Sequence, residues 1–214
     1  GHHGRAYGGV TVVDTEIGKM FSFDGANDFI SFDGLNYQNA TEWSFSAWVK
    51  KAAYNQYASI YADYDWTDRN IILGYEFNDG AMVFYAGSGT TAEYLSTTGN
   101  TTGELVHWAF TFKGSEHMRI YRNGLLVAEK TTDVPASIAA NHNVRMLGRY
   151  GACSFNGKIG LPKVFNRALT AEEVKSLYMF PEDAAFGNIT ADLLSTGELI
   201  TQTAQIKDAI ITSA

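Results

Sequence analysis

One stretch of the chain concentrates side chains that could bind a ligand. It runs from residue 61 to residue 70 and reads YADYDWTDRN. Flat aromatic rings can stack on the apolar face of a pyranose, while carboxylate, amide and guanidinium groups hydrogen-bond its hydroxyls. This mixture, in a loop on a rigid scaffold, predicts a carbohydrate-binding site. The residues expected to contact the sugar are Tyr61, Asp63, Tyr64, Asp65, Trp66, Asp68, Arg69 and Asn70.

The same stretch allows a second interpretation. Trp66 could pack beneath its own loop, with the acidic side chains merely solvated, because large aromatic side chains are often buried. Tyr85, Tyr94 and Tyr150 lie at predicted strand ends or in loops and could extend a sugar-binding surface, although packing is the simpler role for each. His107 has no partner at metal or triad spacing, so we expect it to be structural.

Short strands must position these side chains. Trp43, Phe45, Ala47 and Val49 fall on one face of a strand and Trp48 on the other, as in a strand between two layers. Asn123-Gly124 is the strongest hairpin signal. Two strands are predicted within 20–32, and others at 43–49, 59–63, 70–77, 82–86, 91–95, 105–112, 119–122, 125–130, 144–147 and 158–165. More than ten strands require a sandwich or a barrel.

A single short helix follows Thr170. The Thr170 hydroxyl can cap it while Glu173 reaches back to the Thr170 amide, which is a capping box. Val174, Leu177 and Tyr178 then share one face, which we expect to pack on the strands.

The last part of the chain differs from the rest. After Pro181 the aromatic content falls and isolated aliphatic pairs recur, among them Leu193-Leu194 and Ile210-Ile211. We therefore expect a globular domain over 1–180 and a tail over 181–214. The tail buries too little to fold alone, so we expect a homo-oligomer in which copies of the tail pack together.

The composition limits the kinds of partner that we expect for this protein. The net charge is −7, and no Lys/Arg cluster is visible along the sequence, so nucleic acid is not an expected partner. No apolar run is long enough for membrane insertion. Cys153 is the only cysteine, so the core must hold by packing without an internal disulfide, which favours a bacterial or viral origin.

Residues 21–30, 45–49, 107–112, 119–124 and 155–174 form five segments that together resemble laminin-G-like modules. They follow in that family's order, and the resemblance covers about residues 18–180. It implies an all-β, two-sheet jelly-roll sandwich of the laminin-G/concanavalin A-like kind. That fold hosts lectins, adhesion modules and glycanases, so it does not by itself specify a function.

The resemblance also implies a possible calcium site. Family members often hold Ca²⁺ between carboxylates of the first strand and acidic residues before the final helix. Asp24 and Asp28 match the first set, but Gly160-Leu161-Pro162 stands where the second is usual. Because Ca²⁺ takes six to eight oxygen ligands, we expect at most weak binding and modest stabilisation.

Catalysis is not expected. The glycanases of this fold place carboxylates on alternate residues of one strand, in the pattern Glu-x-Asp-x-Glu, so that they converge on one cleft. Here the nearest acids, Glu76 and Asp79, are three residues apart and run into a turn, so they diverge. A glycosidase is retained only as an alternative.

The tail separately resembles segments of bacteriophage tail-tip and tail-fibre proteins. This resemblance implies a trimer on a virion tail, and a bacterial extracellular surface is the other location considered. The sequence therefore predicts a non-catalytic glycan-binding module that recognises a cell-surface glycan or receptor. The main alternative is a structural or protein-binding decoration domain without affinity for glycans.

Overall fold

The computed structural model describes residues 4–32, 39–55, 57–64, 71–77, 80–87, 92–99, 101–138, 145–148 and 154–181. Of residues 64, 71–77, 145 and 146 it describes the backbone alone. The described part forms strands and one short helix. They are β1 (Gly4–Tyr7), β2 (Thr11–Thr15), β3 (Gly18–Asp24), β4 (Phe29–Phe32), β5 (Glu42–Lys51), β6 (Ser59–Tyr64), β7 (Ile71–Phe77), β8 (Ala81–Gly87), β9 (Ala92–Thr97), β10 (Leu105–Lys113), β11 (His117–Arg122), β12 (Leu125–Lys130), β13 (Arg145–Leu147), β14 (Asn156–Phe165) and α1 (Ala171–Met179).

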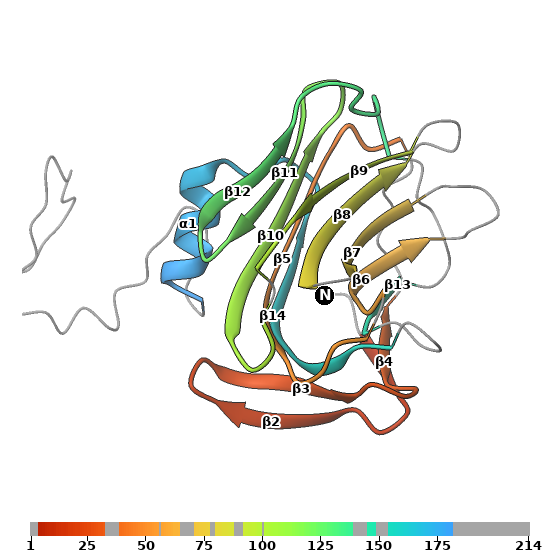
Figure 1. Cartoon of the computed structure of the whole chain (residues 1–214), viewed down its shortest axis with the longest axis vertical. Coiled ribbons are helices and arrows are strands. Elements are labelled where there is room, and N and C mark those ends of the chain that lie inside the picture. The colour runs from red at the N-terminus through yellow and green to blue at the C-terminus, as the bar shows by residue number, and fades with distance from the viewer. Residues whose placement is uncertain are drawn as a thin grey trace, which may run out of the picture. The chain divides into compact units, whose positions relative to one another are not determined.

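The strands form two antiparallel sheets of seven. The sheet with the order β1-β4-β13-β6-β7-β8-β9 is called the front sheet, and the sheet with the order β12-β11-β10-β5-β14-β3-β2 the back sheet. Figure 1 shows α1, in blue, beside β12 and β11. The predicted all-β, two-sheet sandwich with one short helix is therefore confirmed.

An aromatic cluster fills the space between the sheets. Phe84 of the front sheet lies 5.3 Å from Phe110 and 6.0 Å from Trp43 of the back sheet, measured between ring centroids. Phe45 and Tyr61 extend the cluster, with their centroids 5.0 Å apart. None of these side chains is more than 1% exposed. The two sheets thus hide each other's apolar faces.

β5 is covered on both faces, as its sequence predicts. Trp43, Phe45, Ala47 and Val49 belong to the core between the sheets. Trp48 points the other way and stacks on Tyr178 of α1, with the centroids 5.5 Å apart.

The capping box at the start of α1 is also confirmed. The Thr170 hydroxyl accepts a hydrogen bond from the Glu173 amide at 3.2 Å, and the Glu173 carboxylate accepts one from the Thr170 amide at 2.9 Å. Val174 and Leu177 pack against Ala109 and Tyr121 of the back sheet. No helix in the described ranges is long and apolar enough to cross a membrane.

Two strands were not predicted from the sequence. β1 pairs with β4 and β2 pairs with β3, so both are edge strands. Their residues are mostly exposed, as Val12 is at 56%, and therefore lack the buried alternation by which the other strands were found. Residues 182–214 lie outside the described residues, so the boundary near 180 stays a prediction.

Truncating the aromatic cluster should cost much of the stability. We expect Phe84→Ala to lower the free energy of unfolding by about 3 to 5 kcal/mol, because it leaves a cavity between the sheets. The exposed Val12→Ala should change it by less than about 1 kcal/mol. Urea titration followed by tryptophan fluorescence measures both. Equal effects of the two variants would show that the cluster does not hold the sheets together.

Candidate functional site

The structure places the start of the predicted sugar-binding stretch inside the protein. Tyr61 is fully buried and lies between Trp43 and Phe45, with ring centroids 5.4 and 5.0 Å away. Asp63 is also fully buried. Tyr61 is therefore a packing residue, and its ring is not available for stacking on a sugar at the surface.

The structure describes little of the rest of that stretch. Tyr64 is the last residue of β6, and only its backbone is described. Asp65, Trp66, Asp68, Arg69 and Asn70 lie outside the described residues, so their part in binding stays a prediction.

Two tyrosines stand opposite each other on the outward face of the front sheet. Tyr85 of β8 pairs in register with Tyr94 of β9. Met82, Phe84 and Ala86 point into the core, so Tyr85, which alternates with them, points outward. Tyr94 is 61% exposed and Tyr85 is half-buried. We call these two residues the tyrosine pair.

The tyrosine pair lies near the strand ends that flank the predicted stretch. Tyr85 is in register with Leu73 of β7, which is in register with Ala62 of β6. β6 ends at Tyr64 and β7 begins at Ile71, both within two residues of that row. Figure 1 shows β6, β7, β8 and β9 as neighbouring strands. The pair is therefore displayed at the end of the front sheet from which residues 65–70 connect β6 to β7.

The chemistry available to the tyrosine pair is stacking and hydrogen bonding. Opposite residues of an antiparallel pair have Cβ atoms about 5 Å apart, so two rings there offer adjoining apolar surfaces with a hydroxyl on each. The exposed Ser96 follows Tyr94 by two residues and adds a hydroxyl on the same face. Sequence reasoning singled out both tyrosines but could not pair them, because only the register of β8 and β9 brings them together.

The sheet behind the pair is anchored to the back sheet. Lys130 of β12 makes an ion pair with Glu93 of β9, with 3.1 Å between nitrogen and oxygen. Both side chains are about two thirds or more buried. This contact joins the edges of the two sheets beside Tyr94, which gives the pair a rigid support.

The two carboxylates proposed as calcium ligands act on the backbone. Asp28 is 1% exposed, and its oxygens accept hydrogen bonds from the amide of Gly9 and, at 2.9 Å, from the amide of Asp24. Asp24 accepts from the amide of Ala26 at 2.8 Å. Asp28 thus ties the β3–β4 turn to the turn between β1 and β2. A calcium ion would compete with these amides, which fits the expectation of weak binding.

No cluster of three or more His, Cys, Asp or Glu side chains that could hold a metal occurs among the residues that the structure describes.

His107 belongs to a buried network beneath α1. Its Nε2 lies 2.8 Å from the Ser46 hydroxyl, and the two residues are 1% and 2% exposed. Its ring lies 5.5 Å from that of Trp48 and 6.0 Å from that of Tyr178. Burial, with a smaller contribution from the charge of Lys163, lowers the pKa of His107 to about 4. Because Ser46 and His107 are both enclosed, the pair is structural and no substrate reaches it.

The chain matches one protein family and a set of solved structures. The family model described as the concanavalin A-like lectin/glucanases superfamily matches residues 24–175. None of the curated proteins matches the sequence.

Solved structures share the fold at low identity. Domain 4 of AbnA, an extracellular GH43 arabinanase from Geobacillus stearothermophilus solved with arabinotriose, is 23% identical, with a TM-score of 0.66, and the match covers 83% of this chain and 87% of that one. The botulinum neurotoxin serotype G binding domain is 15% identical, with a TM-score of 0.69 and coverages of 85% and 47%. A structure of botulinum neurotoxin type C, whose cell entry depends on interaction with two ganglioside molecules, is 12% identical, with a TM-score of 0.63 and coverages of 83% and 46%. The chain thus spans about half the length of the toxin domains that it matches.

Acid should destabilise the protein through His107. The pKa is about 4 in the folded state, against about 6.5 when unfolded, so the stabilisation from neutral His107 is complete above pH 6.5. As pH falls from 6.5 to 4, His107 becomes protonated in the unfolded chain but stays neutral in the folded chain. This difference lowers the free energy of unfolding by roughly 3 kcal/mol.

Urea titrations at several pH values between 7 and 4 measure this loss, with His107→Gln as the control. The variant can still hydrogen-bond Ser46 but has no group that titrates in this range. Its stability should fall with pH less steeply than that of the wild type. Parallel pH profiles would show that His107 is not held neutral by the fold.

Proposed function

Because the chain belongs to the concanavalin A-like lectin/glucanases superfamily, we propose that it is a non-catalytic carbohydrate-binding domain whose contact surface includes Tyr85 and Tyr94. The observation that carries this proposal is the tyrosine pair itself. Tyr94 leaves 61% of its surface in water beside a second outward-facing tyrosine, on a sheet whose other face is core.

Stacking explains why such a pair would be useful. A pyranose has one flat apolar face, and two adjoining phenol rings cover it without a conformational change, because the strands already hold them. The predicted contacts from residues 65–70 would add carboxylate, amide and guanidinium groups at the same end of the sheet. A rigid aromatic surface with polar groups beside it suits an oligosaccharide better than a small apolar ligand.

The similar structures support the choice of ligand class. One is a domain solved with arabinotriose and another is a toxin whose cell entry depends on gangliosides. Their identity to this chain is below 25%, so they establish the fold alone, and a sugar ligand for this chain is part of the proposal.

We further propose a biological setting for the module. The resemblance of residues 181–214 to phage tail-tip and tail-fibre segments supports a receptor-recognition domain on a virion tail, with a bacterial extracellular surface as the other setting. The expected homotrimer would present several tyrosine pairs at once, so that individually weak sites would add up to strong attachment.

The tyrosine pair gives the sharpest test of glycan binding. A glycan array identifies a binding sugar, and isothermal titration calorimetry then compares variants with it. We expect Tyr94→Ala and Tyr85→Ala each to weaken binding about tenfold or more, corresponding to about 1.4 kcal/mol of lost stacking and hydrogen bonding. The control is Tyr7→Ala, since Tyr7 is 36% exposed on β1.

Two results would contradict the proposal. A folded wild type that binds nothing on the array would favour the alternative of a structural or protein-binding decoration domain. Equal weakening by Tyr7→Ala and Tyr94→Ala would show that the pair is not the contact surface.

The assembly is tested separately by sedimentation. We expect the full chain to sediment as a trimer, because the aliphatic pairs of the tail need partners that one tail cannot supply. Sedimentation equilibrium at high micromolar concentration measures the mass. A monomer under these conditions would remove both the trimer and the main support for the virion setting.

A further inference from the structure

A hollow where β3 and β5 end and β14 begins is lined by lysines. Its volume is about 280 Å³, and Lys50, Lys51, Lys158, Asn156 and Ser22 line it. These residues come from β5, β14 and β3, which are adjacent strands. In a chain whose net charge is −7, Lys50 and Lys158 place two positive charges beside one hollow. We call this feature the lysine hollow.

Two of its lysines face each other across neighbouring strands. Lys50 of β5 is directly opposite Lys158 of β14 in the register. Like charges at opposite positions destabilise a sheet. Among the described residues, Lys50 makes an ion pair with Glu16 at 3.8 Å, and the Glu16 side chain is 60% exposed. Lys158 makes no ion pair within the described ranges. The pair is therefore an unfavourable arrangement that an anion placed between the two ammonium groups would relieve.

The walls of the lysine hollow are built by close backbone contacts. Gly157 has a φ of 147°, and a Cβ there would lie 2.3 Å from the Lys50 carbonyl, so a side chain at 157 is excluded. The Gly103 amide donates to the Lys51 carbonyl at 2.7 Å, and the Ala52 amide donates to the Asn156 carbonyl at 2.9 Å. Lys51 is only 4% exposed. The shape of the hollow is thus set by the backbone of the sheet and does not depend on the conformations of the lysine side chains.

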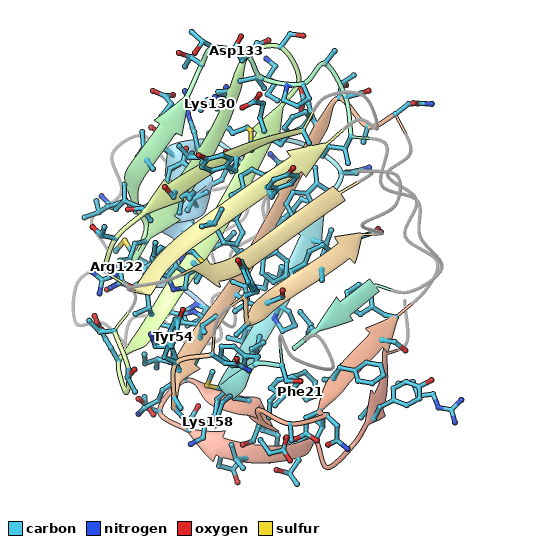
Figure 2. The ribbon with its side chains drawn as sticks, turned by 45° about the vertical axis from the view of Figure 1, so that its right-hand side comes forward. Phe21, Tyr54, Arg122, Lys130, Asp133 and Lys158 are labelled. Atoms are coloured by element: carbon cyan, nitrogen blue, oxygen red, sulfur yellow. The ribbon has the colours of Figure 1, made fainter. Side chains whose placement is uncertain are left out.

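An exposed tyrosine follows the hollow closely in the chain. Tyr54 is 47% exposed and follows Ala52, which lines the hollow, by two residues. Its Cα is therefore at most about 7.6 Å from that of Ala52. The next residue, Asn55, donates a hydrogen bond to the Ser154 carbonyl at 2.8 Å, which holds this loop against the chain before β14. In the view of Figure 2, Tyr54 and Lys158 are both found in the lower left part of the molecule.

We propose that the lysine hollow binds an acidic saccharide unit, one that carries a carboxylate or a sulfate. Lys50 and Lys158 would hold the anionic group, Asn156 and Ser22 would hydrogen-bond neighbouring hydroxyls, and Tyr54 would stack on the ring. The ring contact favours a saccharide over a free anion. This site lies on the back sheet, so it goes beyond the function proposed for the tyrosine pair and does not depend on it.

Calorimetry of the full chain with defined probes tests the proposal. The acidic probe is a chondroitin sulfate tetrasaccharide, the neutral probe is chitotetraose, and sodium sulfate supplies the anion alone. We expect the acidic probe to bind, with affinity falling as salt rises from about 50 to 300 mM, and the other two to bind at least about tenfold more weakly.

Variants that each remove one side chain test whether the acidic probe binds at the lysine hollow. Lys158→Gln and Lys50→Gln should each weaken the acidic probe about tenfold, and Tyr54→Ala should weaken it several-fold. Lys175→Gln removes one exposed lysine on α1 and should leave binding unchanged. Tyr94→Ala should also leave it unchanged, which separates this proposal from the tyrosine pair. Without ligand, Lys158→Gln should keep or raise the melting temperature, because it removes a like-charge pair.

Several results would overturn the proposal. They are no binding of the acidic probe, equal loss from Lys158→Gln and Lys175→Gln, and binding of sodium sulfate as tight as that of the tetrasaccharide. Binding to phosphatidylserine vesicles without binding to the tetrasaccharide would also overturn it, since the partner would then be a lipid surface.

Discussion

The structure depends on the aromatic packing between its two sheets. With Cys153 as its only cysteine, the chain has no internal disulfide, so the sheets must be held by burial. Phe84, Phe110 and Trp43 form the centre of that contact, and rings stacked 5 to 6 Å apart bind more strongly than their buried area alone would suggest. Because this core fixes the strands, their outward faces can carry side chains that contribute little to stability.

The difference between core-facing and outward-facing side chains explains why part of the predicted sugar-binding site is buried. Tyr61 lies in a stretch rich in polar and aromatic residues, which predicts a sugar contact, yet it is part of the core. Side chains of a strand alternate between its two faces, so the sequence divides them into two sets. When both sets contain large aromatic rings, the sequence does not indicate which set faces the core. In β8 the core contains Met82, Phe84 and Ala86, and Tyr85, which alternates with them, consequently faces outward.

Local patterns were enough for much of the fold. The two-faced strand β5 and the Thr170 capping box each depend on residues within one segment, so the sequence predicts them. The edge strands β1 and β2 bury little and carry no such pattern. The lysine hollow could not be predicted for a different reason. Lys50 and Lys158 are far apart in the chain, and only the register of β5 with β14 makes them neighbours, which is why no basic cluster is visible along the sequence.

The central claim is that a glycan contacts the outward face of the front sheet. It is tested most directly by nuclear magnetic resonance, with a neutral oligosaccharide identified on an array titrated into isotopically labelled protein. The account predicts that the largest amide shift changes fall in β8 and β9 around Tyr85 and Tyr94, with the outward face of the back sheet unaffected. Changes confined to the back sheet or to α1 at saturation would contradict it.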